Sequence, residues 1–196
     1  MVRHAPVNTA SDRIYGDDVD VVLGNQITQI RNLAQSLPLP ASLIDRMQEQ
    51  QQSAAKWYYS GVPRTRKSAL AVLESAGMQN APLYEDTGFK EQNFGDLIGK
   101  RHGDVLDHVV FGEGKMLVAA PPAGEDIPQL LERVCAAIKR VYLDALCAGI
   151  PNVVVFTHGG TIRAAHILLN ALPQDRYIDL DTPPFSCHKY EISGDQ

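Results

Sequence analysis

The chain has 196 residues, of which 44% are hydrophobic and 21% are charged. These proportions are typical of one globular domain with a sizeable core, and no apolar run reaches the ~18 residues of a membrane-spanning helix. The formal net charge of −5 argues against a general affinity for nucleic acid. The N-terminus lacks the apolar stretch of a signal peptide, and three widely spaced cysteines indicate reduced thiols and a cytoplasmic location.

The predicted elements alternate between strands and helices, which is typical of an α/β fold. In chain order they are a strand stub over 1–3, a helix over 25–37, a helical pattern through Leu43, Ile44 and Met47, a strand over 56–60, a helix over 65–76, a helix over 127–148, a strand over 153–156 and a helix over 161–172. We therefore expect a three-layer α/β/α sandwich with a mostly parallel central sheet. It should form a single domain over 1–196, with about 95–124 as a lid-like insertion.

Four side chains that can bind or attack a phosphate group lie at or just after the ends of predicted strands. They are Arg3 and His4 after the first strand, Arg64 after the turn Gly61-Val62-Pro63, and His158 in the turn Thr157-His158-Gly159-Gly160. Ligands of open parallel sheets bind beyond the carboxyl ends of the strands. We therefore expect two guanidinium groups and two imidazoles to line one crevice.

This set of groups suits phosphoryl transfer. Arginine presents a planar fork of donors that matches phosphate oxygens, and a neutral imidazole is a nucleophile toward phosphorus. A second imidazole, if protonated, neutralises charge on the phosphoryl oxygens, and Gly159 can offer a backbone N–H at a helix N-terminus. Each residue alone is weak evidence, because Arg-His pairs and helix-start cations are common on surfaces. No CxxC or Cys/His ligand cluster is present, so no metal site is expected.

Five motifs in chain order resemble those of the histidine phosphatase superfamily, also called phosphoglycerate mutase-like. They are Val2-Arg3-His4-Ala5, the segment from Ser60 to Ala69 with Arg64, the segment from Phe89 to Gly99 with Glu91, Pro122-Ala123-Gly124-Glu125 followed by Arg133-Val134, and Thr157-His158-Gly159-Gly160. Ala5 departs from the glycine of the first motif. Tyr15-Gly16 is similar to a loop of alpha-ribazole phosphatases.

The resemblance implies a metal-independent phosphatase that works without a cofactor through a phosphohistidine on His4. It implies that Arg3, Arg64, His158 and Gly159 bind the phosphoryl group, with His158 also counted as catalytic. Glu91 matches the general acid and base. Glu125 is expected to cap or support the following helix near its N-terminus, and it is the alternative candidate for the acid.

Other functions stay open on the sequence alone. One is a phosphoglycerate mutase-type phosphotransferase, although the Glu-Arg-His-Tyr-Gly stretch of such mutases is Glu91-Gln92-Asn93-Phe94-Gly95 here. Another is an inactive regulatory module with the same fold, and a third is a nucleotide-binding α/β protein, which the lack of a GxGxxG loop disfavours. The expected partner is a small phosphorylated substrate, with no nucleic acid and no membrane, and a homodimer stays open.

Overall fold

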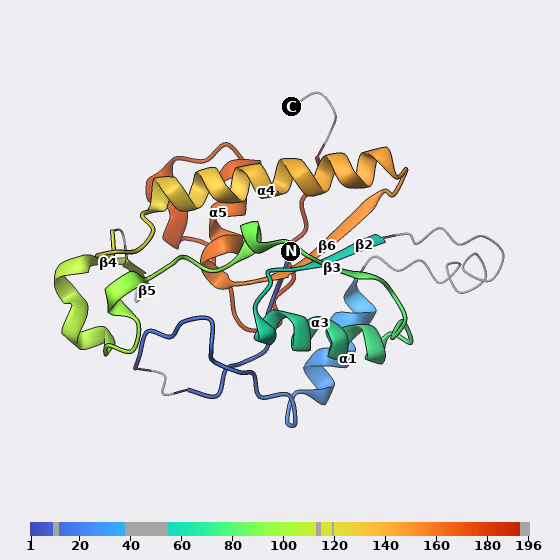
Figure 1. Ribbon diagram of the computed structural model, residues 1–196, viewed down its shortest axis with the longest axis horizontal. Helices are drawn as coiled ribbons and strands as arrows, with labels where there is room; N and C mark the ends of the chain where they lie inside the picture. The colour runs from blue at the N-terminus through green and yellow to red at the C-terminus, as the bar shows by residue number, and fades with distance from the viewer. Residues whose placement is uncertain (10–11, 38–54, 113–114, 119, 193–196) are drawn as a thin grey trace.

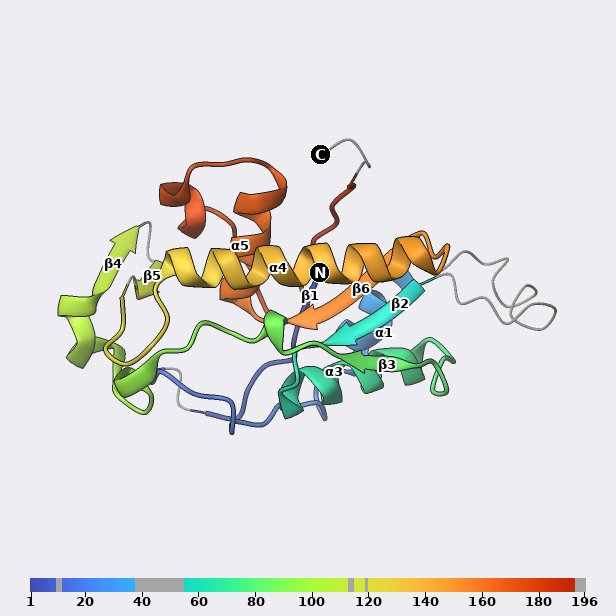
Figure 2. The same cartoon turned by 45° about the horizontal axis from the view of Figure 1, so that its top comes forward.

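The computed structural model describes residues 1–9, 12–37, 55–112, 115–118 and 120–192. A four-stranded sheet in the order β1-β6-β2-β3 lies at its centre, and every described pair of neighbouring strands in it is parallel. The strands are β1 (Val2–Arg3), β2 (Ala55–Tyr59), β3 (Leu83–Glu85) and β6 (Asn152–Thr157). Helices α1 (Ile27–Ser36) and α3 (Pro63–Ser75) cover one face, and α4 (Ile127–Cys147) and α5 (Gly159–Leu169) cover the other (Figures 1 and 2). The expected α/β/α sandwich is confirmed.

The sheet is buried on both faces because its strands carry apolar side chains at consecutive positions. Trp57 and Phe156 are 1% and 0% exposed and belong to the cluster beneath α1 and α3. Their neighbours Tyr58 and Val155 belong to the cluster beneath α4 and α5. The alternation follows from the two-residue period of a strand, and it determines which face of the sheet each side chain packs on.

Two strand–turn–helix units form where the sequence predicted them. After β2, Gly61 adopts a φ of +81° and Pro63 occupies the first turn of α3, where its missing N–H costs nothing. After β6, His158 is the extended N-cap residue of α5 and provides no side-chain cap. Both units turn at the carboxyl edge of the sheet, so the first turns of α3 and α5 lie there together.

Strand β3 was not expected from the sequence. It has three residues, pairs with β2 from Trp57↔Leu83 to Tyr59↔Glu85, and its exposed positions give no apolar run. The conformation of such a short strand depends on its pairing with the neighbouring strand, and its own sequence pattern is too short to predict it. The helical pattern predicted through Leu43, Ile44 and Met47 lies outside the described residues.

The segment predicted as a lid-like insertion contains short elements of its own. These are the 3-10 helices Gly95–Leu97 and His102–His108 and an antiparallel hairpin of β4 (Val109–Gly112) and β5 (Lys115–Val118). The hairpin lies at one end of the molecule, away from α1 and α3 (Figure 1). Ile14, Leu97 and Val105 form a small separate apolar cluster. That the segment acts as a lid stays a prediction. Across the described ranges, no helix is both long and apolar enough to span a membrane.

Candidate active site

The structure brings His4, Arg64 and His158 together at the carboxyl edge of the sheet. The backbone N–H of His4 donates to the Thr157 carbonyl at 2.9 Å, which places the end of β1 beside the end of β6. The two imidazole rings lie 5.1 Å apart, edge to face at 63°. Arg64 Nη2 lies 3.3 Å from Nδ1 of His158. All three residues are at most 2% exposed, so none of them is one of the solvated surface residues that the sequence also allowed.

The hydrogen bonds of His4 define its tautomer. Nδ1 of His4 lies 2.6 Å from the carbonyl oxygen of Ala5, and a carbonyl can only accept, so Nδ1 carries the hydrogen. In a neutral ring the other nitrogen, Nε2, then holds the lone pair. The ring therefore presents an unprotonated nitrogen that is available for nucleophilic attack.

The backbone after His4 is also held in place. The Ala5 N–H donates to Ser68 Oγ at 2.8 Å, and that hydroxyl donates to the Arg64 carbonyl at 2.7 Å. Ala5 is 0% exposed. The residue that departs from the family's glycine thus links the His4 loop to the first turns of α3.

Burial keeps His4 neutral. Burial, which the hydrogen bond to the Ala5 carbonyl opposes in part and the positive charges of Arg64 and Arg3 reinforce, lowers the pKa of the His4 imidazole to about 3. Protonation of an imidazole is unfavourable when the ring lies in a low-dielectric interior and near cations. At neutral pH His4 is therefore in its nucleophilic form.

His158 is neutral as well. Its Nδ1 accepts from Arg64 and its Nε2 contacts Ser60 Oγ at 2.8 Å, so the hydrogen lies on Nε2. Burial, then the neighbouring His4 imidazole and the nearby arginines, hold the pKa of His158 well below the usual value. The protonated form considered from the sequence is therefore not the form of the unliganded site. A bound dianion would favour the proton on this ring, because it adds negative charge nearby.

The two arginines retain unused donors. Arg64 donates through Nη1 to the Gly16 carbonyl at 2.8 Å, and Arg3 donates through Nη1 to the Thr182 carbonyl. Nε of Arg3, Nε of Arg64 and Oγ1 of Thr182 are buried and have no hydrogen-bond partner among the described residues. Buried donors without partners are rare and costly, and an anion with several acceptor oxygens would satisfy such a set.

Glycines at the start of α5 leave space for this cluster. A Cβ on Gly159 would lie 2.9 Å from Thr182 Oγ1 and 3.5 Å from Arg3 Cζ. Gly159 is the first residue of α5, and its N–H belongs to the open first turn of the helix. Only a residue without a side chain fits between the helix N-terminus and these two side chains.

Glu91 lies against the same helix N-terminus. Its Oε2 accepts a hydrogen bond from the backbone N–H of Gly160 at 3.1 Å, and its Oε1 accepts one from the backbone N–H of the next residue, Gln92, at 3.0 Å. Its charge acts on Arg64, whose pKa is lowered by burial and partly restored by nearby anionic groups that include Glu91. The carboxyl group therefore belongs to the site and is not a solvated loop residue.

Glu125 contacts α4 through an ion pair rather than as its N-cap residue. The helix cap of α4 is Asp126, which forms a capping box with Gln129. Glu125 instead accepts both Nε and Nη2 of Arg133, at 2.7 and 2.6 Å. Of the two expected roles, capping is wrong, because Asp126 is the N-cap residue and its shorter side chain reaches the Gln129 N–H. The ion pair with Arg133 on α4 agrees with the other role, support of the helix.

Arg133 connects this ion pair to the loop that carries Glu91. It donates to the carbonyls of Gly88, Lys90 and Glu91 at 2.9, 3.1 and 3.3 Å. The hydroxyls of Thr157 and Thr161 hold the same loop from the other side by donating to the Phe89 and Lys90 carbonyls, each at 2.6 Å. The backbone of the Glu91 loop is therefore fixed from both α4 and β6–α5.

Sequence reasoning gave no role to three residues of this arrangement. Ser60 and Arg133 lie inside the recognised motifs, Ser60 at a strand end and Arg133 in the second turn of α4, and these positions could have drawn attention to them. Thr182 lies in the chain that follows α5 and carries no local signal, because only its contacts with Arg3 and Gly159 place it here.

No group of three or more His, Cys, Asp or Glu side chains that could hold a metal ion occurs within the described residues. His166 is on α5 with its ring 6.2 Å from that of Tyr190.

Comparison with known proteins gives the family. The profile of the histidine phosphatase superfamily (branch 1) matches residues 1–196. A 2,3-bisphosphoglycerate-dependent phosphoglycerate mutase of Methylobacterium radiotolerans is 26% identical over 127 residues, which are 63% of this chain and 59% of that protein. The chain thus spans about three fifths of the length of that curated relative.

Solved structures agree on the fold. A mycobacterial glucosyl-3-phosphoglycerate phosphatase is 21% identical with a TM-score of 0.65, over 94% of this chain and 85% of that one. A protein of Escherichia coli proposed to be an alpha-ribazole-5'-phosphate phosphatase is 19% identical with a TM-score of 0.65, over 90% and 80% of the two chains. The full-length profile match and the shared fold make the chain a member of the histidine phosphatase superfamily, branch 1.

Proposed function

We propose that this protein is a phosphomonoester hydrolase that forms a phosphohistidine on His4. The observation that carries the proposal is the state of His4, which is neutral and protonated on Nδ1, between Arg3 and Arg64. In the first step Nε2 attacks phosphorus and the bond to the leaving oxygen breaks. Protonated Glu91 gives its proton to that oxygen, so a neutral alcohol leaves.

The second step returns the enzyme to its starting state. The Glu91 carboxylate takes a proton from water as the water oxygen attacks phosphorus, and the P–N bond to His4 breaks to release inorganic phosphate. Arg3, Arg64, His158 and the Gly159 N–H hold the phosphoryl oxygens in both steps and stabilise the added charge. Two fixed guanidinium groups fill the role that a metal ion has in other phosphatases, so turnover should persist in the presence of a chelator.

Trapping of the intermediate tests the proposal. A ³²P-labelled substrate, quenched in base and digested, should leave label on the peptide that contains His4, because a P–N bond survives base and is lost in acid. His4→Ala should abolish label and turnover while its circular dichroism stays that of the parent. Label on the His158 peptide, or substantial turnover of His4→Ala, would contradict the assignment.

The role of Glu91 has its own test. An alkoxide needs a proton to leave whereas a nitrophenolate does not, so Glu91→Gln should slow an alkyl phosphate by about 10²-fold or more and nitrophenyl phosphate far less. Equal losses on both substrates would assign the acid elsewhere. Glu125→Gln tests the alternative candidate for the acid, whose carboxylate pairs with Arg133.

A phosphoglycerate mutase activity is the second candidate, because curated relatives of this chain carry that name. Labelled phosphoenzyme offered 3-phosphoglycerate should release inorganic phosphate if the protein is a hydrolase. Transfer of the label to the acceptor would favour the mutase instead.

A further inference from the structure

Helix α5 begins with two glycines, and the site has no room for a side chain at either of them. A Cβ on Gly159 would lie 2.9 Å from Thr182 Oγ1, and a Cβ on Gly160 would lie 2.3 Å from Glu91 Oε1. Glycine loses more conformational freedom on folding than any other residue, and the first N–H groups of a helix have no partner within the helix. The helix start that orients Glu91 therefore has few constraints of its own and needs one from elsewhere in the fold.

Tyr177 supplies a constraint from outside the helix. Its hydroxyl donates a hydrogen bond to the Gly160 carbonyl oxygen at 2.9 Å, while the Gly160 N–H donates to Glu91 Oε2 at 3.1 Å. Both backbone groups of one glycine are thus engaged, one by the tyrosine and the other by the proposed acid. Tyr177 belongs to the 3-10 helix Gln174–Ile178, which follows α5 in the chain and packs against it.

The ring of Tyr177 is itself fixed. It is 3% exposed and packs in the apolar cluster beneath α4 and α5. One helical turn after Gly160, Arg163 Nε donates to the Leu180 carbonyl at 3.1 Å, which ties the chain after the 3-10 helix to α5 as well. Side chains in a close-packed interior have little freedom to move, so the hydroxyl of this ring holds the carbonyl that it binds in one orientation.

The same hydroxyl lies near the Glu91 carboxyl group. A Cβ on Gly160 would lie 2.8 Å from the Tyr177 hydroxyl oxygen as well as 2.3 Å from Glu91 Oε1, so both side chains border the small space over this glycine. Burial, and after it the negative charge of Glu91, raises the pKa of Tyr177 above its usual value. The hydroxyl therefore keeps its hydrogen at neutral pH and donates it to the Gly160 carbonyl.

We propose that Tyr177 is a positioning residue for the general acid and that it acts through Gly160. Its hydroxyl orients the Gly160 backbone, and the Gly160 N–H then keeps the Glu91 carboxyl group where the leaving oxygen of the substrate meets it. This inference rests on the hydrolase proposal, because it assigns a supporting residue to the acid of that reaction. A residue that acts on the acid alone affects kcat for substrates that need a proton donor and leaves phosphate binding unchanged.

Tyr177→Phe tests the inference, because it removes the hydroxyl and keeps the buried ring. The kcat on an alkyl phosphate should fall about tenfold with KM changed by less than about twofold, and kcat on nitrophenyl phosphate should stay within about twofold of the parent. The Gly160 amide should exchange its hydrogen about tenfold faster in this variant, because its hydrogen bond is to Glu91 and not within the helix.

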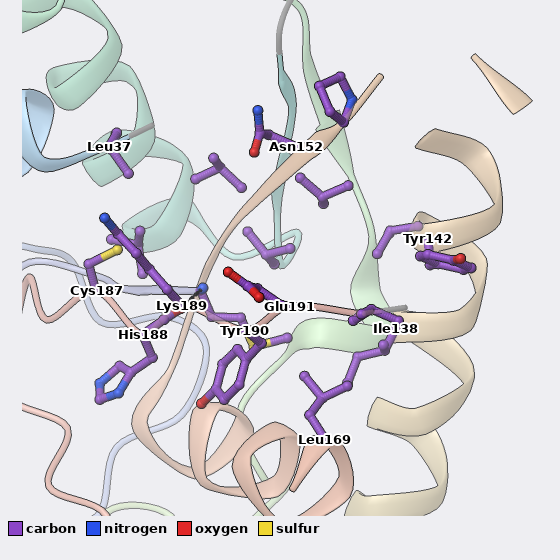
Figure 3. A pocket seen from close by; sticks show the side chains of 18 residues that line it. Leu37, Ile138, Tyr142, Asn152, Leu169, Cys187, His188, Lys189, Tyr190 and Glu191 are labelled. Atoms are coloured by element: carbon purple, nitrogen blue, oxygen red, sulfur yellow. Dashed lines mark hydrogen bonds between the residues drawn. The ribbon is translucent and has the colours of Figure 1, made fainter. Parts of the chain in front are cut away.

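Two other tyrosines provide controls for the loss of a hydroxyl. Tyr58 belongs to the same apolar cluster and its hydroxyl donates to Asp144, so Tyr58→Phe should lower the stability and keep the alkyl-to-aryl rate ratio of the parent. Tyr190 and Leu169 line a cavity at the other end of α5 (Figure 3), and Tyr190→Phe should also keep that ratio. A ratio that falls as far in either control as in Tyr177→Phe would overturn the proposal.

A double variant separates this inference from the hydrolase proposal. If Tyr177 acts through Glu91, adding Tyr177→Phe to Glu91→Gln should cost less than about twofold in kcat on the alkyl phosphate. A further loss of about tenfold in that background would overturn the inference, as would an unchanged kcat or equal losses on both substrates in Tyr177→Phe alone. In these cases the hydrolase proposal still stands if Glu91→Gln is selective for the alkyl phosphate. Glu91→Gln without that selectivity would overturn the assignment of the acid and this inference with it.

Discussion

The backbone N–H of Gly160 donates to Oε2 of Glu91 at 3.1 Å, so the first turn of α5 holds the carboxyl group proposed as the general acid. The same helix start presents Gly159 to the arginine cluster. One helix N-terminus therefore orients both the phosphate-binding groups and the proton donor. A side chain at either glycine would therefore collide with one of these groups.

Gly160→Ala should displace Glu91. A Cβ at this position would lie 2.3 Å from Glu91 Oε1 and 2.8 Å from the Tyr177 hydroxyl, so the carboxyl group must move. We expect about a 10²-fold loss of kcat on an alkyl phosphate and a much smaller loss on nitrophenyl phosphate. Gly24→Ala is the control, because a Cβ there meets no atom within 4 Å. Uniform losses on both substrates would mean that the substitution damages phosphate binding rather than the acid.

Arg133→Ala should loosen the Glu91 loop, because it removes the ion pair with Glu125 and three carbonyl contacts. The kcat on alkyl phosphates should fall more than KM changes, and stability should drop by about 1–3 kcal/mol as partners lose hydrogen bonds. Arg133→Lys should recover only part of the loss, since an ammonium group lacks the planar fork.

Arg176→Ala provides the comparison for Arg133. Its ion pair with Asp179 involves side chains that are 63% and 46% exposed, and such pairs contribute little. Kinetic constants of this variant should match the parent. If Arg133→Ala left the alkyl-to-aryl rate ratio unchanged, a positioning role of Arg133 would be wrong.

The free energy of unfolding should decrease as the pH is lowered below about 6.5. The pKa of His4 is about 3 in the folded protein, against an ordinary value near 6.5 in the unfolded chain. Between these two pH values the unfolded chain binds a proton on His4 and the folded protein does not. Each unit by which the pH falls therefore lowers the free energy of unfolding by about 1.4 kcal/mol. His158 acts in the same direction. Urea denaturation at pH 7, 6 and 5 should show this slope, and His4→Gln should reduce it. An equal slope in both proteins would contradict a buried neutral His4.

Inorganic phosphate should stabilise the protein. It offers acceptors to Nε of Arg3, Nε of Arg64 and Oγ1 of Thr182, which have no partner among the described residues. At 100 times its Kd the anion adds about 2.7 kcal/mol to the free energy of unfolding, which a thermal shift detects. Arg64→Ala should lose the shift, and Thr182→Val should reduce it while Thr182→Ser retains it. Equal shifts in all variants would place phosphate elsewhere.

The residues predicted from the sequence lie together, and their chemical roles stay predictions. His4, Arg64 and His158 could be foreseen because each follows a strand end, and parallel strands end at one edge. The neutral state of His158 could not be foreseen, because it depends on burial and on the hydrogen bond from Arg64. The position of Glu125 likewise depends on Arg133, eight residues away on another element.

The features that the sequence by itself determined depend on residues close together in the chain. The apolar run of β6, the turn residues Gly61 and Pro63 and the glycines after His158 carry their signals within a few residues. The tertiary structure decided the pairing of β3, the hydrogen bond of Arg3 to Thr182, and the contacts of Arg133 with Glu125 and with the Glu91 loop. Each of these joins segments far apart in the chain, and a pairing or a burial between such segments is set by packing rather than by the propensity of either segment.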